Sequence, residues 1–361
     1  GLYDFCVSTF GWWAEGISTR IMGWGEVLAD KMKVVFKVNT GAAVLGLGYI
    51  IGLKYAAIIC AGSFTVWFVL IPFISHFADG PTLAVGEGIS VLLRDMTPEQ
   101  IFSNYARHIG IGGIAMAGVI GIIRSSSIIK QALGLAVSEL GGKKKGEGAV
   151  ERTQRDISMK FILSGIISIL IATFVFFQFG VLGNLTHTII ATLIVFVISF
   201  LFTTVAANAI AIVGSNPVSG MTLMTLILSS LVLVSAGLSG TSGMMAAMII
   251  GGVVCTALSM AGGFITDLKI GYWLGTTPAR QEGWKFLGTA VSAATIAGVM
   301  MVLNQTYGFV GENALVAPQA NAMAAVIKPL MEGGATPWLL YFAGAAMAMI
   351  LRMIGDPELA F

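Results

Sequence analysis

Two short polar motifs lie between long apolar runs and hold most of the side chains that can do chemistry. The first spans residues 215–222, Ser-Asn-Pro-Val-Ser-Gly-Met-Thr, and the second spans residues 267–281 and carries both signs of charge. Their hydroxyl, amide and charged groups can bind a polar solute through hydrogen bonds and ion pairs. Polar sequence in or beside a bilayer is costly and usually marks a pathway.

The first motif must interrupt a helix. Pro217 has no amide proton and disfavours helix at Asn216, and Gly220 adds backbone freedom. Irregular backbone in a bilayer is tolerated where it is buried in protein or lines a watery cavity. A helix that begins near Pro217 also points its positive end here, which suits a carboxylate. The alternative is a tight cytoplasmic turn in which Asn216 acts as a cap.

The second motif places a charge pair at the end of an apolar run. Asp267 and Lys269 are costly so close to lipid unless they contact partners or water. A plain cytoplasmic loop explains Lys269 and Arg280, but residues 271–274 are too apolar for a solvated connector. We therefore expect a binding or gating role. The candidate residues of both motifs are Ser215, Asn216, Pro217, Ser219, Gly220, Thr222, Asp267, Lys269, Gly271, Tyr272 and Arg280.

The composition predicts a polytopic integral membrane protein. Of 361 residues, 56% are hydrophobic and 11% are charged, whereas soluble domains carry about 25% charge. The net charge of +2 gives no indication of a nucleic-acid partner. The 46 glycines predict closely packed helix faces, notably over residues 110–121 and 237–252, because small residues let membrane helices approach one another.

The remaining reactive residues give no enzymatic or metal signature. The three cysteines are far apart and lack disulfide or zinc spacing, and each of the three histidines lies near the end of a predicted span. We predict no catalytic residue, cofactor or metal site. Asp267, Glu282 and His187 are weak candidates for proton coupling, and the sequence does not choose among them. The 18 methionines indicate adaptable packing, with a soft-metal pathway as the alternative.

The fold predicted from these patterns is an all-α, polytopic transmembrane helical bundle with broken or re-entrant helices. We divide it into short or interfacial helices (1–40), N-terminal spans and an amphipathic helix (41–140), a cytoplasmic basic loop (141–158) and a C-terminal transmembrane bundle (159–361). Thr97 and Pro98 predict the start of a surface helix. The predicted apolar segments are 41–53, 55–77 with a kink at Pro72, 105–123, 159–179, 188–213, 221–238, 242–265, 284–303 and 337–354. Residues 317–330 are too short to span and are expected to be re-entrant or to lie at the surface.

The number of spans between the two basic loops tests the predicted topology, because an even number places both loops on the same side of the membrane. The basic loop at 141–157 and the loop at 266–283 should both be cytoplasmic by the positive-inside rule. Four predicted spans separate them, so both loops fall on one side if Asn216 and Pro217 form a turn between two spans or the meeting point of a re-entrant pair. The cations Lys31, Lys33 and Lys37 fall on the opposite side if residues 41–53 span. The chain starts without Met and stops abruptly, so we expect a fragment of something longer.

Three segments resemble the oligopeptide transporter family, and most closely its bacterial branch, which is related to the yellow stripe-like transporters. They are Gly-Tyr-Ile-Ile-Gly at 48–52, Asn-Pro at 216–217 with Gly-Met-Thr at 220–222, and the segment from Asp267 to Tyr272 followed by Thr-Pro at 277–278 and Arg-Gln at 280–281. The eukaryotic branch has a second lysine and Pro-Pro-Arg where this chain has Gly275 and residues 277–279. The resemblance runs from about residue 41 to the end, and because family members are longer, it implies the C-terminal portion of an internally repeated transporter.

The resemblance implies secondary active, proton-coupled import of small peptides or metal chelates by alternating access, in a bacterial inner membrane. Asn216 and Ser219 would then hydrogen-bond the solute, and Lys269 or Arg280 would meet a carboxylate. The partners implied are the solute, the bilayer and protons, with a homo-oligomer left open. One rival is an intramembrane enzyme that modifies lipids or isoprenoids, but the predicted spans lack converging carboxylates or histidines. Another rival is a channel or a structural subunit.

Overall fold

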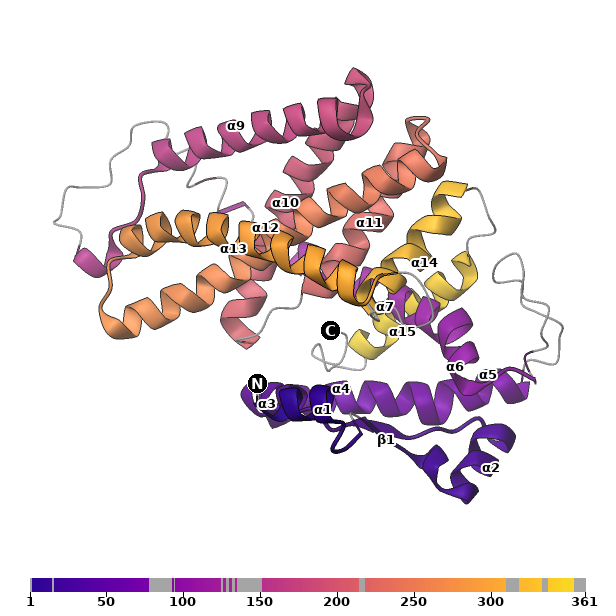
Figure 1. Ribbon diagram of the computed structural model, residues 1–361. Helices are drawn as coiled ribbons and strands as arrows, with labels where there is room; N and C mark the ends of the chain where they lie inside the picture. Colours follow the sequence, from indigo (N-terminus) through magenta and orange to yellow (C-terminus); the bar gives the residue numbers. More distant parts are fainter. Residues whose placement is uncertain are drawn as a thin grey trace. The chain divides into compact units, whose positions relative to one another are not determined.

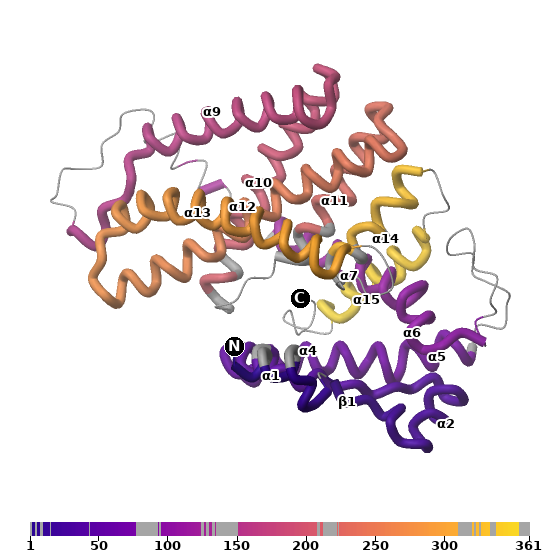
Figure 2. The backbone as a smooth tube through the Cα atoms, viewed as in Figure 1, coloured from indigo at the N-terminus to yellow at the C-terminus, as the bar shows by residue number. Residues whose placement is uncertain are grey.

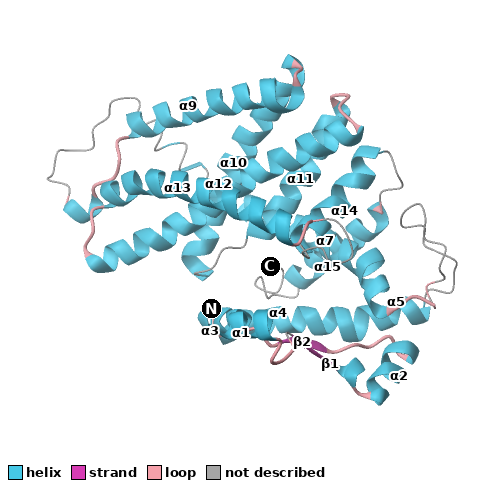
Figure 3. Cartoon of the chain, viewed as in Figure 1, coloured by secondary structure: helices cyan, strands magenta, loops and turns pink. Residues whose placement is uncertain are grey.

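The protein is almost entirely helical (Figure 3). The structure, a computed structural model, describes residues 2–14, 16–77, 93, 95–124, 126–127, 130–131, 134, 151–213, 218–309, 318–332 and 337–353. Two compact units are present: one comprises Gly1–Ala117 with Gly333–Phe361, and the other comprises Gly118–Glu332. The fold is a membrane helical bundle, as the composition predicts.

The N-terminal region combines short helices with a small sheet. Helices α1 (Leu2–Phe10) and α2 (Gly23–Lys31) accompany strands β1 (Gly16–Ser18) and β2 (Lys37–Asn39), which pair antiparallel with Ile17 opposite Val38. The short helices were expected, and the sheet was not. Three-residue strands are too short to show the alternation of side chains that would reveal them.

The first long apolar helix begins after a break at Gly52. Helix α3 (Ala42–Ile51) ends there because Gly52 adopts a φ of 86°. Helix α4 (Leu53–Phe64), a π-helical segment (Thr65–Leu70) and α5 (Ile71–Phe77) then follow without interruption. At about 1.5 Å per residue, α3 is too short to cross a bilayer. The expectation that Lys31, Lys33 and Lys37 face the side opposite Lys54 depended on a span over residues 41–53, which α3 is too short to form.

The helix predicted to start at Thr97 is capped as expected. Thr97 and Gln100 form a reciprocal capping box at the start of α6 (Pro98–Ile101). We expected a surface helix and a separate span, but α6 continues through π-helical Phe102–Ala106 into α7 (Arg107–Arg124). Helix α15 (Trp338–Met353) packs directly on α7. Added Cβ atoms at Gly112 and Gly344 would overlap the backbones of Tyr341 and Ile109, so both positions require glycine.

The second unit is built around one helix, α12 (Figure 1). Its helices are α9 (Met159–Phe176), α10 (Leu185–Val213), α11 (Val218–Ser235), α12 (Gly240–Leu274), α13 (Pro278–Thr306) and α14 (Pro318–Glu332). α10, α11 and α14 pack against α12. Their apolar core includes Phe202, Leu226, Leu233, Ile250, Val254, Leu258 and Ile327. Gly251 faces Leu226 with no room for a Cβ, as the predicted small-residue face requires.

Helix α14 is an integral part of this core. It carries Pro329 inside the helix and buries Ile327 and Met331 against the neighbouring helices. A Cβ at Gly243 of α12 would lie 3.0 Å from Met331 Sδ. The segment too short to span therefore packs against longer helices and does not lie free on the surface.

Six helices of the described chain are long and apolar enough to cross a membrane. They are Leu53–His76, Pro98–Ile123, Arg152–Leu182, Leu185–Ala207, Gly240–Leu274 and Pro278–Thr306, with Met224–Ser235 and Trp338–Met353 as shorter apolar helices. Four helices, α9, α10, α11 and α12, lie between the two basic segments; α9, α10 and α12 are long enough to span, and α11 holds the shorter apolar stretch Met224–Ser235. The amphipathic continuation expected over 124–140 falls largely outside the described residues.

Candidate solute site at the α12–α13 hairpin

The loop expected at 266–283 is much shorter than predicted. Helix α12 continues through the charged residues to Leu274, and α13 begins at Pro278. Gly275 ends α12 with a φ of 69°, and Thr276 N donates to Gly271 O at 2.8 Å. Pro278 starts α13 at a position where its missing amide proton costs nothing. The predicted interruption at Gly-Thr-Thr-Pro is therefore confirmed as a tight turn between two long helices.

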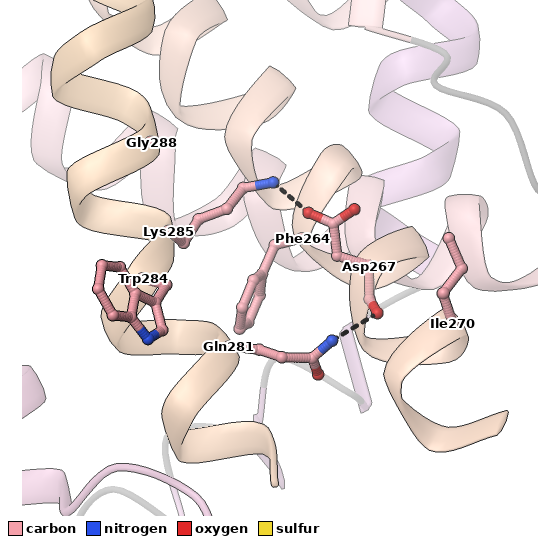
Figure 4. Close-up of a pocket in the computed structure, with 7 residues that line it drawn as sticks. All are labelled: Phe264, Asp267, Ile270, Gln281, Trp284, Lys285 and Gly288. Carbon is pink, nitrogen blue, oxygen red and sulfur yellow. Dashed lines mark hydrogen bonds and ion pairs between the residues drawn. The ribbon is translucent and has the colours of Figure 1, made fainter. Parts of the chain in front are cut away.

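An ion pair joins the two helices behind this turn. Lys285 of α13 contacts Asp267 of α12, and Gln281 Nε2 donates to Asp267 O at 3.2 Å. Figure 4 shows Lys285 and Gln281 extending from α13 toward Asp267, with the Phe264 ring between the helices. The side chains of Lys285 and Asp267 are 31% and 46% exposed, so the ion pair is partly buried. A Cβ at Gly271 would overlap the Gln281 amide, which explains the glycine there.

The pair borders an open cavity of about 340 Å³. The lining residues are Phe264, Asp267, Ile270, Gln281, Trp284, Lys285 and Gly288. A wall of aromatic and aliphatic groups with a few convergent polar atoms is typical of small-molecule sites, which span about 300–1,000 Å³. Asp267 and Lys285 are the charged residues of its lining.

Of the charged residues predicted in the second motif, only Asp267 lines this cavity. Lys269 lies two positions along α12, about 200° around the helix, and its Nζ stands 5.4 Å from the Trp273 ring and 5.9 Å from the Tyr272 ring. Arg280 is exposed at the start of α13. The cation in the cavity is Lys285, which the sequence reasoning missed. Asp267 lies seven residues before the end of α12 and Lys285 lies seven residues after the start of α13, so a hairpin brings them level.

Only the second part of the first motif lies in the described chain, at the start of α11. Ser215, Asn216 and Pro217 lie outside the described residues, between α10 and α11. Ser219 and Gly220 belong to the first turn of α11, and Thr222 is buried on the same helix. α10 is described to Val213 and α11 from Val218, so the expected interruption falls outside the described residues.

The first turn of α11, which holds part of the first motif, and Asp267 lie toward the same end of the α11–α12 pair, whose helices are joined by a short turn (Figure 2). Helices joined by so short a turn run antiparallel, and Leu226 lies against Gly251. At about 1.5 Å per residue, the first turn of α11 is then level with Ser259, and Asp267 lies about 12 Å further along the axis.

The end of the basic loop is attached to the same hairpin. Arg152 Nη2 donates to Gly275 O at 2.8 Å, Ala279 N donates to Arg155 O at 3.0 Å, and Ile157 N donates to a Glu282 carboxylate oxygen at 2.9 Å. The two basic segments that parity assigned to one side of the membrane are therefore in direct contact. We call residues 151–158 the strap.

Each candidate for proton coupling has a partner in the structure. Asp267 pairs with Lys285, Glu282 accepts from the strap, and His187 Nε2 lies 3.1 Å from Ala236 O. Among the described residues, no three His, Cys, Asp or Glu side chains gather to hold a metal ion. The polar contacts between α12 and α13 at this site are a hydrogen bond and an ion pair.

The long apolar helices define a multi-pass integral membrane protein. The profile described as OPT oligopeptide transporter protein matches residues 1–359. The chain belongs to this family, which comprises transporters and not enzymes. The match also extends to residue 1, well before the start expected at about residue 41.

A relative from Haemophilus influenzae, which carries the provisional name of an oligopeptide transporter, is 24% identical over 361 residues. The match covers 89% of this chain and 54% of the relative, so the chain spans about half the length of that protein. No solved structure matches.

Proposed function

We propose that this chain handles the solute in a secondary transporter that imports small peptides or related metal-chelate solutes, with the α12–α13 cavity on the route. The observation that carries the proposal is the half-exposed pair of Asp267 and Lys285 in an open cavity between two helices long enough to cross a bilayer. Charged side chains at such places are costly and are retained where a polar path needs them.

The chemistry of the pair suits a zwitterion. A small peptide carries an ammonium group and a carboxylate, and the cavity offers Asp267 for the first and Lys285 for the second. When no solute is bound, the two side chains neutralise each other, which limits the cost of holding charges near lipid. Solute binding would exchange the internal pair for two external ones and so loosen α13 from α12. Loosening of one helix against another suits alternating access.

The two predicted motifs support one route. The first turn of α11 and the ion pair lie toward the same end of α12, and the strap joins that end. We place Ser215, Asn216, Pro217, Ser219, Gly220 and Thr222 near the route, with Asp267, Lys269, Gly271, Tyr272 and Arg280 at its edge or gate. A proton gradient as the driving force and a bacterial inner membrane as the location belong to the same proposal.

The test is uptake of a labelled dipeptide into proteoliposomes, with and without a pH gradient. Lys285→Met should reduce uptake by about tenfold, equivalent to about 1.4 kcal/mol, while membrane insertion stays normal. Lys269→Met should have a smaller effect because Lys269 lies off the cavity. The matched control is Lys160→Met, which removes an exposed lysine of α9.

The double variant Asp267→Lys with Lys285→Asp restores the pair in reverse and should recover part of the uptake. Normal uptake by Lys285→Met would remove this cavity from the route. Flux that rises with the gradient and never saturates would instead indicate a channel.

A further inference from the structure

A second buried polar group lies in the other unit, where α15 crosses α7. His108 and Tyr341 are each 8% exposed, and their ring centroids are 5.7 Å apart. The backbone of Asn104 interacts with the imidazole. Among the described residues, however, His108 Nδ1 and the Tyr341 hydroxyl have no hydrogen-bond partner. Two orphaned polar atoms on neighbouring rings in an apolar helix crossing require an explanation.

The cost of such atoms is large. A buried donor or acceptor without a partner loses the hydrogen bonds that it makes with water in the unfolded chain, and water is scarce in the bilayer interior. Phenylalanine in place of Tyr341 would keep the ring contacts with His108 and Trp338 and would avoid the orphaned hydroxyl. Ring packing alone therefore explains the aromatic shape at these positions and leaves the polar atoms unexplained.

The crossing holds the two rings in place. One turn after His108, Gly112 brings α7 against the backbone of Tyr341, and Gly344 brings α15 against the backbone of Ile109. Backbone contact on both sides leaves little freedom for the helices to slide. The neighbouring core, which includes Ile101, Tyr105 and Leu340, is fully packed. The two rings are thus held in place by the helix crossing.

We propose that His108 and Tyr341 together bind one hydrogen-bonding oxygen atom between α7 and α15. The phenol hydroxyl can donate or accept, and Nδ1 can do either according to the tautomer, so one oxygen that pairs with both satisfies both. This oxygen belongs to a water molecule or to a carbonyl or hydroxyl group of the transported solute. The second source rests on the proposed function, whereas the first does not.

The test is nitrogen NMR of the full chain in lipid nanodiscs with ¹⁵N-labelled histidine. The chain has three histidines, and His108→Gln identifies the His108 signals by their loss. Tyr341→Phe should shift the Nδ1 signal of His108, because it removes one of the two groups that hold the oxygen. Tyr307→Phe, which removes an exposed phenol at the end of α13, should leave that signal unchanged.

A second measurement uses the unaltered protein, so it does not depend on whether Tyr341→Phe folds. Magnetisation transfer from water protons to His108 Nδ1 without added solute would support a bound water. Transfer or a shift that appears only after addition of dialanine would support a solute oxygen. A His108 signal that is insensitive to Tyr341→Phe, to water and to dialanine would overturn the proposal. The uptake result for Lys285→Met is independent of all three outcomes.

Discussion

The two halves of α12 make contacts of opposite kinds. Residues from Gly243 to Leu258 form a buried strip of small and aliphatic groups against α10, α11 and α14. Beyond Gly262 the helix meets α13 through a charged pair and an amide, beside open space. In α13, all of which is described, no residue is buried. One half of α12 is therefore suited to hold its neighbours in place, and the other is suited to let a neighbour move.

The largest effect is expected in the packed half. Gly251→Ala places a methyl group against the buried Leu226 side chain, and overpacking of this kind costs about 1–3 kcal/mol. Gly252→Ala, the next residue, adds a methyl group into open space and should cost almost nothing. Thermal unfolding in nanodiscs measures both variants. Equal destabilisation would show that the strip against α11 is not tightly packed.

In the open half, loss of the ion pair should affect transport more than stability. Partly exposed ion pairs contribute about 0–1 kcal/mol to stability, so Asp267→Asn should lower the unfolding temperature only slightly. Its dipeptide uptake should nevertheless fall by about tenfold, because a binding charge is lost. Parallel melting and uptake assays separate the two effects. A large drop in unfolding temperature with a proportionate loss of uptake would show that the ion pair stabilises the fold and does not bind the solute.

A smaller effect is expected at the glycine under Gln281. Gly271→Ala would displace the Gln281 amide and break its hydrogen bond to Asp267 O, at a cost of about 0.5–1.5 kcal/mol. Gly283→Ala, where a Cβ meets nothing within 4 Å, is the control. The Michaelis constant for dipeptide uptake should rise in the first variant alone. Identical kinetics in both would mean that the placement of Gln281 does not shape the cavity.

The smallest effect is expected at the strap. Arg152→Ala removes the side-chain bond to Gly275 O, whereas Arg155→Ala leaves its backbone bond to Ala279 in place. Limited proteolysis should cleave residues 151–158 about threefold faster in the first variant, because loss of one hydrogen bond favours local opening. Faster cleavage of Arg155→Ala would show that charge, and not the specific bond, holds the strap.

Local signals predicted local structure well. The Thr97 cap, the stop before Pro278 and the small-residue faces follow from backbone chemistry that a few neighbouring residues determine. The continuation of α12 through Asp267 and Lys269 was missed because charge near lipid was taken as a sign of a loop. A helix tolerates Asp267 there because Lys285 neutralises it from the next helix, and such a partner becomes visible only when the hairpin geometry is known.

The central claim is that the α12–α13 cavity lies on the path of the solute. The most direct test introduces Gly288→Cys, at the cavity wall, into a chain whose Cys6, Cys60 and Cys255 are changed to serine. A charged, membrane-impermeant thiol reagent should modify the new cysteine, and excess dipeptide should slow that reaction, whereas Gly283→Cys outside the cavity should react at an unchanged rate. Modification of Gly288→Cys that dipeptide does not slow, or no modification at all, would contradict the account.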